Sequence, residues 1–235
     1  MLFPPCQKSP SSGRRVKSSV PRRRSSVAPL ALSLAVLLAG PAPAAAQQVA
    51  PLTTSDGRVA CQQGMTGIGR PPAWKAVAEK EALGGWALAE TAGDATYQRF
   101  PLCISIQTAA LDIDATLRFK IVSGTREQAA GLVLRAQDAN DYYAVMVSAR
   151  DKSVRLYRMR GGKRAQLGSA TADIAIGRWH ALRVVARWDR FEVWLDGAAQ
   201  FGLNDRSLVH AGTVGVLSQA DSVVHFGSLT VAPPP

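Results

Sequence analysis

The stretch GLVLRAQDANDYYAVMVSA, residues 131–149, decides how the rest of this chain is interpreted. Two apolar runs, at 132–134 and 142–147, flank the polar segment QDAND at 137–141. Two such runs joined by a short turn rich in Asp and Asn are typical of a β-hairpin. We therefore predict a hairpin at the centre of a sheet, with Leu132 and Leu134 toward the core and Arg135 toward an open face.

Short apolar and alternating runs recur on both sides of this hairpin, separated by Gly, Asp, Asn and Ser. In 115–122, for example, Leu117, Phe119 and Ile121 share one face while Arg118 and Lys120 share the other. A period of two with one polar face is typical of antiparallel sheets that pack on one side. The predicted strands are 74–78, 86–90, 102–106, 115–122, 131–136, 142–149, 153–160, 163–170, 179–188, 190–195, 198–204, 213–218 and 222–231. Only 73–83 has a composition that also fits a helix.

The first 46 residues have the features of a secretory signal peptide. Their start carries seven Lys or Arg and no acid, followed by a fourteen-residue apolar run at 27–40 and small residues up to Ala46. A membrane anchor is the alternative, but a spanning helix needs about 20 apolar residues. Three consecutive arginines at 22–24 leave both general and twin-arginine export open. We expect a periplasmic or secreted protein with no stable membrane span after cleavage.

Most of the chain's net positive charge lies in this N-terminal segment. The whole chain has a formal charge of +11, but seven of its 28 basic residues and none of its 17 acidic residues lie in 1–46, which leaves +4. The high isoelectric point therefore reflects export, and we expect no nucleic-acid partner. Residues 47–72 show no apolar period, so we predict an irregular lead there, followed by one domain over 73–233.

Two cysteines, Cys61 and Cys103, remain in the exported part. In an oxidising compartment they can pair, and the loop would enclose about 40 residues. Two unpaired thiols, one of them buried in a strand, are the alternative, because sequence spacing does not show whether the two Cα atoms lie close together.

Catalytic patterns are weak in this sequence. Asp112 and Asp114 have the spacing of two carboxylates on one strand face, but Asp is also common where strands begin. The three histidines, His180, His210 and His225, are best explained as hydrogen-bonded structural residues. The sequence contains no Gly-x-Ser-x-Gly elbow and no His/Cys metal spacing. We predict no catalytic residue and no cofactor.

Calcium is the one metal that we consider. Asp138, Asn140 and Asp141 place hard oxygen ligands in the hairpin turn. Asx residues also form turns without any metal, so both explanations stay open.

Carbohydrate binding is the best functional candidate. Sugar sites stack aromatic rings on C–H groups and use planar polar side chains for the hydroxyls. Aromatic residues and arginines alternate on or beside the predicted strands, and Trp194 stands opposite a face that buries Phe191, Val193 and Leu195. The predicted binding residues are Arg135, Tyr142, Tyr157, Arg183 and Trp194.

The segments on which a family resemblance rests are 99–102, 118–124, 128–135, 138–143, 154–157, 177–184, 193–197 and 220–222. In them the chain resembles the concanavalin A-like jelly roll, and more closely the exported bacterial domains grouped with laminin-G-like domains and with the 3-keto-disaccharide hydrolase-type domain of unknown function. The resemblance implies an all-β jelly-roll sandwich of two antiparallel sheets. It implies no catalytic residue, because the same fold carries lectins, glycosidases and adhesion modules.

We therefore expect an exported, non-catalytic β-sandwich that binds a glycan or another cell-envelope component on the polar face of one sheet. A sugar-active hydrolase of the 3-keto-disaccharide type is one alternative, and a structural or protein-interaction domain of the envelope is another. Nothing in the sequence indicates the oligomeric state.

Overall fold

The computed structural model describes residues 47–235, except for the side chains of residues 107 and 108. The predicted signal peptide lies outside the described residues. The elements are β1 (Gln48–Ala50), β2 (Cys61–Gly67), β3 (Trp74–Ala78), the 3-10 turn η1 (Leu83–Gly85), β4 (Trp86–Glu90), β5 (Arg99–Ala110), β6 (Ile113–Ser123), β7 (Ala129–Ala136), β8 (Tyr142–Ser148), β9 (Ser153–Arg160), β10 (Lys163–Thr171), β11 (Trp179–Arg187), β12 (Arg190–Leu195), β13 (Ala198–Asn204), β14 (Gly212–Ser218) and β15 (Val223–Ala232). Within this part of the chain, no helix is long and apolar enough to span a membrane.

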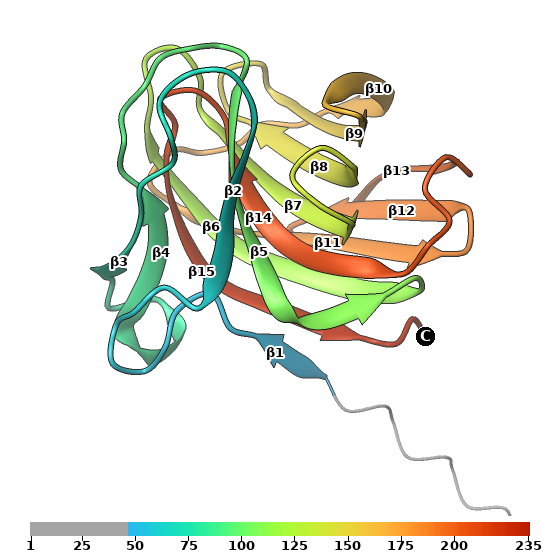
Figure 1. Cartoon of the computed structure of the whole chain (residues 1–235), viewed down its shortest axis with the longest axis horizontal. Coiled ribbons are helices and arrows are strands. Elements are labelled where there is room, and N and C mark those ends of the chain that lie inside the picture. Colours follow the sequence, from blue (N-terminus) through green and yellow to red (C-terminus); the bar gives the residue numbers. More distant parts are fainter. Residues whose placement is uncertain (1–46) are drawn as a thin grey trace, which may run out of the picture. The chain divides into compact units, whose positions relative to one another are not determined.

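The strands form two antiparallel sheets that face one another (Figure 1). One sheet has eight strands in the order β13-β12-β11-β6-β15-β4-β3, with β1 paired to β15. The other has seven, in the order β10-β9-β8-β7-β14-β5-β2. The predicted all-β jelly-roll sandwich is confirmed.

The predicted hairpin is the pair β7–β8, and it lies inside the seven-stranded sheet with β14 on one side and β9 on the other. Both strands are buried along their whole length. Leu132 and Leu134 enter the core between the sheets, as predicted, while Val133 and Ala144 join a second apolar cluster on the opposite face. The nearly continuous apolar runs at 132–134 and 142–147 therefore reflect a hairpin that is covered on both sides.

The eight-stranded sheet follows the simpler pattern of one buried and one polar face. Leu117, Phe119 and Ile121 of β6 point into the core between the sheets, and Arg118 on the other face is exposed. The same alternation buries Leu182, Val184 and Ala186 in β11. In β12 it buries Phe191, Val193 and Leu195, as predicted.

The predicted irregular lead at 47–72 is wrong in part, because it contains two strands of the sandwich. β1 pairs with β15, and β2 pairs with β5 along its whole length at one edge of the seven-stranded sheet. In β2 only Thr66 is buried, so this edge strand shows no apolar period. Its pairing comes from backbone hydrogen bonds, which any sequence can make. The segment 73–83 contains strand β3 and not a helix.

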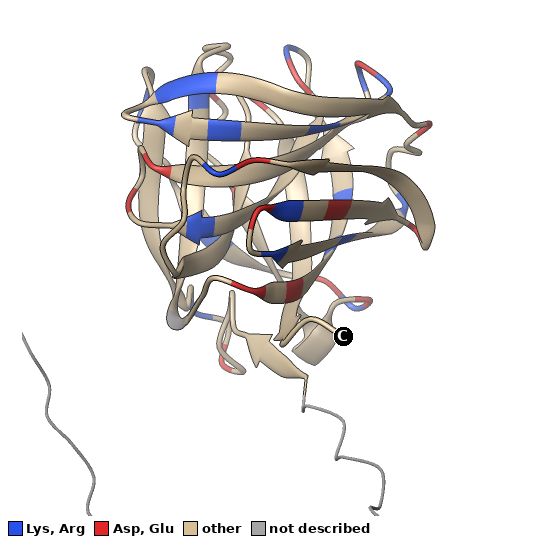
Figure 2. Ribbon diagram, turned by 90° about the vertical axis from the view of Figure 1, so that its right-hand side faces the viewer, with Lys and Arg blue, Asp and Glu red and all other residues tan. Residues whose placement is uncertain are grey.

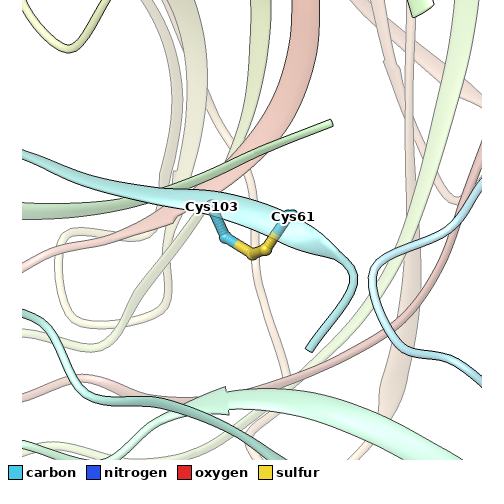
Figure 3. The surroundings of a disulfide bond; sticks show 2 residues. All are labelled: Cys61 and Cys103. Carbon is cyan, nitrogen blue, oxygen red and sulfur yellow. A yellow bond between two sulfur atoms is a disulfide. The ribbon is translucent and has the colours of Figure 1, made fainter. Parts of the chain in front are cut away.

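Cys61 and Cys103 form a disulfide, which was one of the two alternatives that the sequence left open (Figure 3). It ties β2 to β5 with a Cα–Cα distance of 5.4 Å, and Cys103 is completely buried. The bridge therefore holds a largely polar edge strand on the sheet where few apolar contacts do so.

Removing the disulfide is expected to destabilise the fold. The cysteines are 42 residues apart, and cross-linking a loop of that length stabilises a protein by about 3–4 kcal/mol in the chain-entropy description. Urea unfolding of the Cys61→Ala/Cys103→Ala protein should show this loss. A reductant should lower the wild-type midpoint and leave the double variant unchanged; an unaffected wild-type midpoint would contradict the prediction.

A buried ion pair joins the two sheets at the end where β4 leads into β5. Arg99 and Glu90 are completely or almost completely buried, and the guanidinium donates to both carboxylate oxygens, at 3.0 and 2.9 Å. Arg99 also donates to the carbonyls of Arg70 and Ala220, at 2.8 and 3.1 Å. Glu90 Oε1 accepts from the backbone N–H groups of Ala73 and Ala92, both at 2.9 Å. Each charge therefore has its partners, as a buried pair requires.

Substitution Glu90→Gln should destabilise the protein by about 3 kcal/mol, because it leaves the Arg99 charge buried without its counter-ion. Urea denaturation measures the loss. The control is Asp56→Asn, which breaks the exposed Arg58–Asp56 pair and should cost at most about 0.5 kcal/mol. Similar losses for the two variants would refute the structural importance of the buried pair.

Candidate functional site

Arg135 does not lie on an open face, so this part of the sequence prediction is wrong. Its side chain is buried between the sheets, with 1% exposure. The reason is a β-bulge: opposite β14, the register shifts between Thr213 and Gly215, and Arg135 adopts a positive φ of 51°. A bulge re-aims the side chain that follows it.

The Arg135 guanidinium joins three loops at one end of the sandwich. It donates to the carbonyls of Leu111, Leu208 and Trp188, at 2.9, 3.2 and 2.6 Å. It also lies 5.0 Å from the ring centre of Phe191. Burial lowers the pKa of this group. These contacts assign Arg135 a structural role.

Arg183 and Trp194 do come together, on the outer face of the eight-stranded sheet. They are cross-strand partners, and the guanidinium lies 5.0 Å from the indole centre. Arg183 also donates to both carboxylate oxygens of Asp114, at 2.8 and 2.6 Å, and this raises its pKa. Asp112 accepts from the backbone of Trp188 at 2.6 Å. Both carboxylates of the Asp112/Asp114 pair therefore form structural hydrogen bonds.

The hairpin turn uses its carboxylates to shape the backbone. Asp138 Oδ1 accepts from the backbone N–H groups of Asn140 and Asp141, at 2.6 and 2.9 Å. Asp141 Oδ1 accepts from the N–H of Gly161 at 3.1 Å, which ties this turn to the next one. Among residues 47–235, no group of three or more His, Cys, Asp or Glu side chains is arranged to hold a metal ion. Calcium binding here stays a prediction.

Two of the histidines make the hydrogen bonds expected of structural residues. The ring nitrogens of His180 contact Asp196 Oδ2 at 2.6 Å and the carbonyl of Ala175 at 2.9 Å. His225 Nδ1 contacts Glu79 Oε2 at 2.8 Å.

Tyr142 and Tyr157 lie on the outer face of the seven-stranded sheet, away from Arg183 and Trp194. Both are buried in the second apolar cluster, and the Tyr142 hydroxyl lies 2.8 Å from Thr66 Oγ1. Burial raises the pKa of Tyr142 to about 12. The Arg164 guanidinium covers two rings of this cluster, at 4.8 Å from Tyr157 and 4.9 Å from Phe100. Arg164 belongs to β10 and Phe100 to β5, and these two strands are far apart in the order of the seven-stranded sheet. Their side chains are in contact only because the sheet is strongly curved toward this face.

A narrow cleft opens at the rim of this face. Its lining combines two tyrosines, two arginines, two carboxylates and several hydroxyl or amide groups: Tyr97, Glu127, Ala129, Met146, Ser148, Asp151, Ser153, Arg155, Tyr157, Arg164 and Gln219. Of the five predicted binding residues, only Tyr157 belongs to it.

Glu127 is the unusual group in the narrow cleft. The residue is only 6% exposed, yet its carboxylate accepts no hydrogen bond from the described residues. Burial raises its pKa, and the nearby Asp151 charge raises it further. The Ser153 hydroxyl in the same lining is also buried without a partner. The cleft therefore presents a carboxylate acceptor and a hydroxyl to any hydroxyl group that reaches its mouth.

Defined contacts hold the remaining walls of the cleft. Arg155 pairs with Asp151 at 2.7 Å. Tyr97, which is 41% exposed, stands at the rim, where its carbonyl accepts from Gln219 Nε2 at 3.0 Å. The loop before Tyr97 is shaped by Asp94, which accepts from Arg70 N at 2.6 Å and from Thr96; these hydrogen bonds lower the Asp94 pKa to about 2.

A second, wider depression adjoins the narrow cleft and shares Tyr97 and Arg164 with it. We call it the basic hollow, and its lining is Thr66, Gly67, Tyr97, Gln98, Phe100, Met159, Gly162, Lys163 and Arg164. The free space is about 380 Å³ in the basic hollow and about 10 Å³ in the narrow cleft, and the latter is room for about one water molecule. A sugar ring therefore fits the hollow, and the narrow cleft admits at most one of its hydroxyl groups.

Sequence reasoning missed Tyr97, Glu127, Ser153 and Arg164 as site residues. Glu127 lies in the loop between β6 and β7 and Tyr97 in the loop before β5, where no period indicates which side chains converge. Arg164 follows a Gly-Gly turn, which predicts a hairpin and says nothing about the aromatic rings that the guanidinium covers.

Comparison with known proteins supports the fold directly. The carbohydrate-binding module CBM66 from Bacillus subtilis superposes with a TM-score of 0.58 at 19% identity, over 72% of this chain and 94% of the module. A Bacillus subtilis protein of unknown function with a galectin-like fold superposes with a TM-score of 0.54 at 10% identity, over 73% of this chain and 89% of that protein. The fold is therefore a two-sheet jelly roll of the kind seen in these two proteins. No family model and no curated protein matches the sequence.

Substitution Glu127→Gln should stabilise the protein at neutral pH. Because the folded-state pKa is raised, the folded protein holds more protons than the unfolded chain between the two pKa values, and stability falls as pH rises through that window. The penalty is complete above the folded pKa and absent below the unfolded value of about 4.3. We expect a Tm increase of about 2–4 °C at neutral pH, shrinking as the pH is lowered.

Thermal unfolding over a pH series measures this effect. Glu192→Gln, which changes a half-exposed carboxylate on the other sheet, is the matched control and should move Tm little at any pH. A Glu127→Gln protein that is less stable than wild type at neutral pH would show that the carboxylate has a structural partner.

Proposed function

We propose that this protein is an exported, non-catalytic carbohydrate-binding module and that a sugar residue docks in the basic hollow, over the mouth of the narrow cleft. The observation that carries the proposal is the exposed Tyr97 ring, which borders both depressions, beside the Glu127 carboxylate and the Ser153 hydroxyl of the cleft. A sugar carries several hydroxyl groups, and one of them can reach these two polar groups.

The rest of the lining fits the same ligand. Tyr97 stands exposed at the rim, with the Arg126 guanidinium 5.3 Å from the centre of its ring. We expect the exposed part of this ring to stack on the C–H face of a pyranose or furanose. The guanidinium of Arg155, already oriented by Asp151, is a donor for sugar oxygens. One aromatic wall and a few convergent polar groups are the usual composition of such a site.

Two further observations support the proposal. CBM66, which shares the fold, is described as a carbohydrate-binding module. The disulfide between Cys61 and Cys103 fits an oxidising compartment, and so does the signal-peptide pattern of the first 46 residues. These points support a periplasmic or secreted location, with a glycan of the envelope or surroundings as the partner.

A sugar hydrolase is the second candidate, and one feature favours it. Glu127 and Asp151 line the same cleft, and burial raises the pKa of Glu127 while Asp151 is paired with Arg155. Two carboxyl groups in different environments are the starting point of glycosidase chemistry. Release of reducing ends from a bound polysaccharide, lost in Glu127→Gln, would establish this candidate in place of the first.

The test is affinity for a panel of soluble polysaccharides, measured by calorimetry with and without calcium. For any glycan bound by the wild type, Tyr97→Ala and Glu127→Gln should each weaken binding at least about tenfold, through loss of the stacking wall or of the charged acceptor. Trp194→Ala on the opposite sheet is the control and should bind normally.

Two outcomes would overturn the proposal. One is a negative result across the whole panel in both conditions. The other is loss of binding in Trp194→Ala with normal binding in the Tyr97 and Glu127 variants, which would move the site to the eight-stranded sheet.

A further inference from the structure

We propose that the bound glycan is acidic and that the basic hollow receives its carboxylate or sulfate group. This inference rests on the proposed function, because it specifies the ligand of the same face. It is carried by the charges of the hollow, by the way its walls are fixed, and by its continuity with the narrow cleft.

The hollow has cationic side chains and no acidic ones. Lys163 and Arg164 belong to its lining, which includes no Asp or Glu. Both side chains are exposed, and neither forms an ion pair with a carboxylate among residues 47–235. In the narrow cleft, by contrast, Arg155 is already paired with Asp151. Figure 2 shows basic residues side by side on neighbouring strands at the upper edge of that view.

Arg164 is held in an orientation that suits an anion. Its guanidinium lies over the rings of Tyr157 and Phe100, at 4.8 and 4.9 Å. Packing against two aromatic rings fixes the plane of the group and makes no use of its N–H donors, which remain free for a planar oxyanion. Arginine pairs carboxylates and sulfates in this way with little further loss of conformational freedom.

The turn that carries the two cations is fixed from outside the hairpin. Gly161 and Gly162 adopt positive φ values of 54° and 73° between β9 and β10. The N–H of Gly161 donates to Asp141 Oδ1 and that of Gly162 to the carbonyl of Asn140, both at 3.1 Å. The Asp138–Asp141 turn, predicted as a ligand loop, thus helps to set the position of Lys163 and Arg164, although none of its own residues lines the hollow.

The hollow and the cleft share Tyr97 and Arg164 as common walls. A sugar seated against Tyr97, over the mouth of the cleft, would therefore lie beside the two cations itself or place the next residue of a chain there. A neutral residue there would leave the N–H donors of Arg164 to water, whereas a uronate or a sulfated sugar would gain charge-assisted hydrogen bonds. We therefore expect the sugar residue that lies beside Lys163 and Arg164 to be acidic.

The experiment compares three ligands: a polyuronate, the same polymer after reduction of its carboxyl groups to neutral alcohols, and a neutral polymer bearing sulfate esters. The expected result is at least about tenfold tighter binding of the polyuronate or the sulfated polymer than of the carboxyl-reduced polymer, decreasing with added salt. Which of the two charged polymers binds more tightly identifies the anion.

Variants separate the hollow from general charge attraction. Lys163→Gln should remove most of the preference for the acidic polymer, because it should weaken binding of that polymer much more than binding of the reduced polymer. Lys75→Gln, an exposed lysine of β3 on the other sheet, carries the same change in net charge and should keep the preference. Tyr97→Ala should weaken binding of all three polymers.

The outcomes distinguish this inference from the proposed function. Equal affinity for the reduced and charged polymers, or a preference that survives Lys163→Gln, would overturn the acidic-glycan inference and leave carbohydrate binding in place. An equal effect of Lys163→Gln and Lys75→Gln would overturn it too, since the preference would then come from net charge. Failure of all three polymers and of every other glycan to bind would overturn both.

Discussion

The buried pair of Arg99 and Glu90 is the interaction on which the candidate site depends. It joins β5 of one sheet to β4 of the other, and its hydrogen bonds reach the loops before β3 and after β4 and β14. Tyr97 lies two residues before Arg99, and Gln219, which holds the Tyr97 carbonyl, directly precedes Ala220. The rim of the cleft is thus positioned from inside the protein, which leaves its outward-facing groups free for a ligand.

Periodicity was a good guide wherever one face of a strand is buried. The alternation in β6, β11 and β12 and the apolar runs of β7 and β8 identified strands, core residues and the central hairpin. Periodicity failed for β2, a polar edge strand with few apolar contacts. Backbone pairing and a disulfide hold this strand on the sheet. Periodicity also failed at Arg135. A bulge adds one residue to the strand, so each side chain after it points to the opposite face from the one that alternation predicts.

The site was harder to predict than the fold for a topological reason. Arg183, Trp194 and Tyr157 have suitable chemistry, but the sequence does not reveal which sheet a strand joins, and β9 lies in one sheet while β11 and β12 lie in the other. Glu127 is informative only through its environment: a glutamate in a loop is ordinary, whereas a buried glutamate without a hydrogen-bond donor is not. Tyr97 and Arg164 likewise become neighbours only because the seven-stranded sheet curls.

The Arg135 side chain holds three loops together at one end of the sandwich, a task that a metal ion performs in other proteins. One guanidinium satisfies carbonyls from three loops, an arrangement that many extracellular domains obtain from a bound divalent cation. Here the cation is part of the polypeptide and is supplied as the chain folds. A chelator cannot remove it, and these three contacts need no metal ion from the medium.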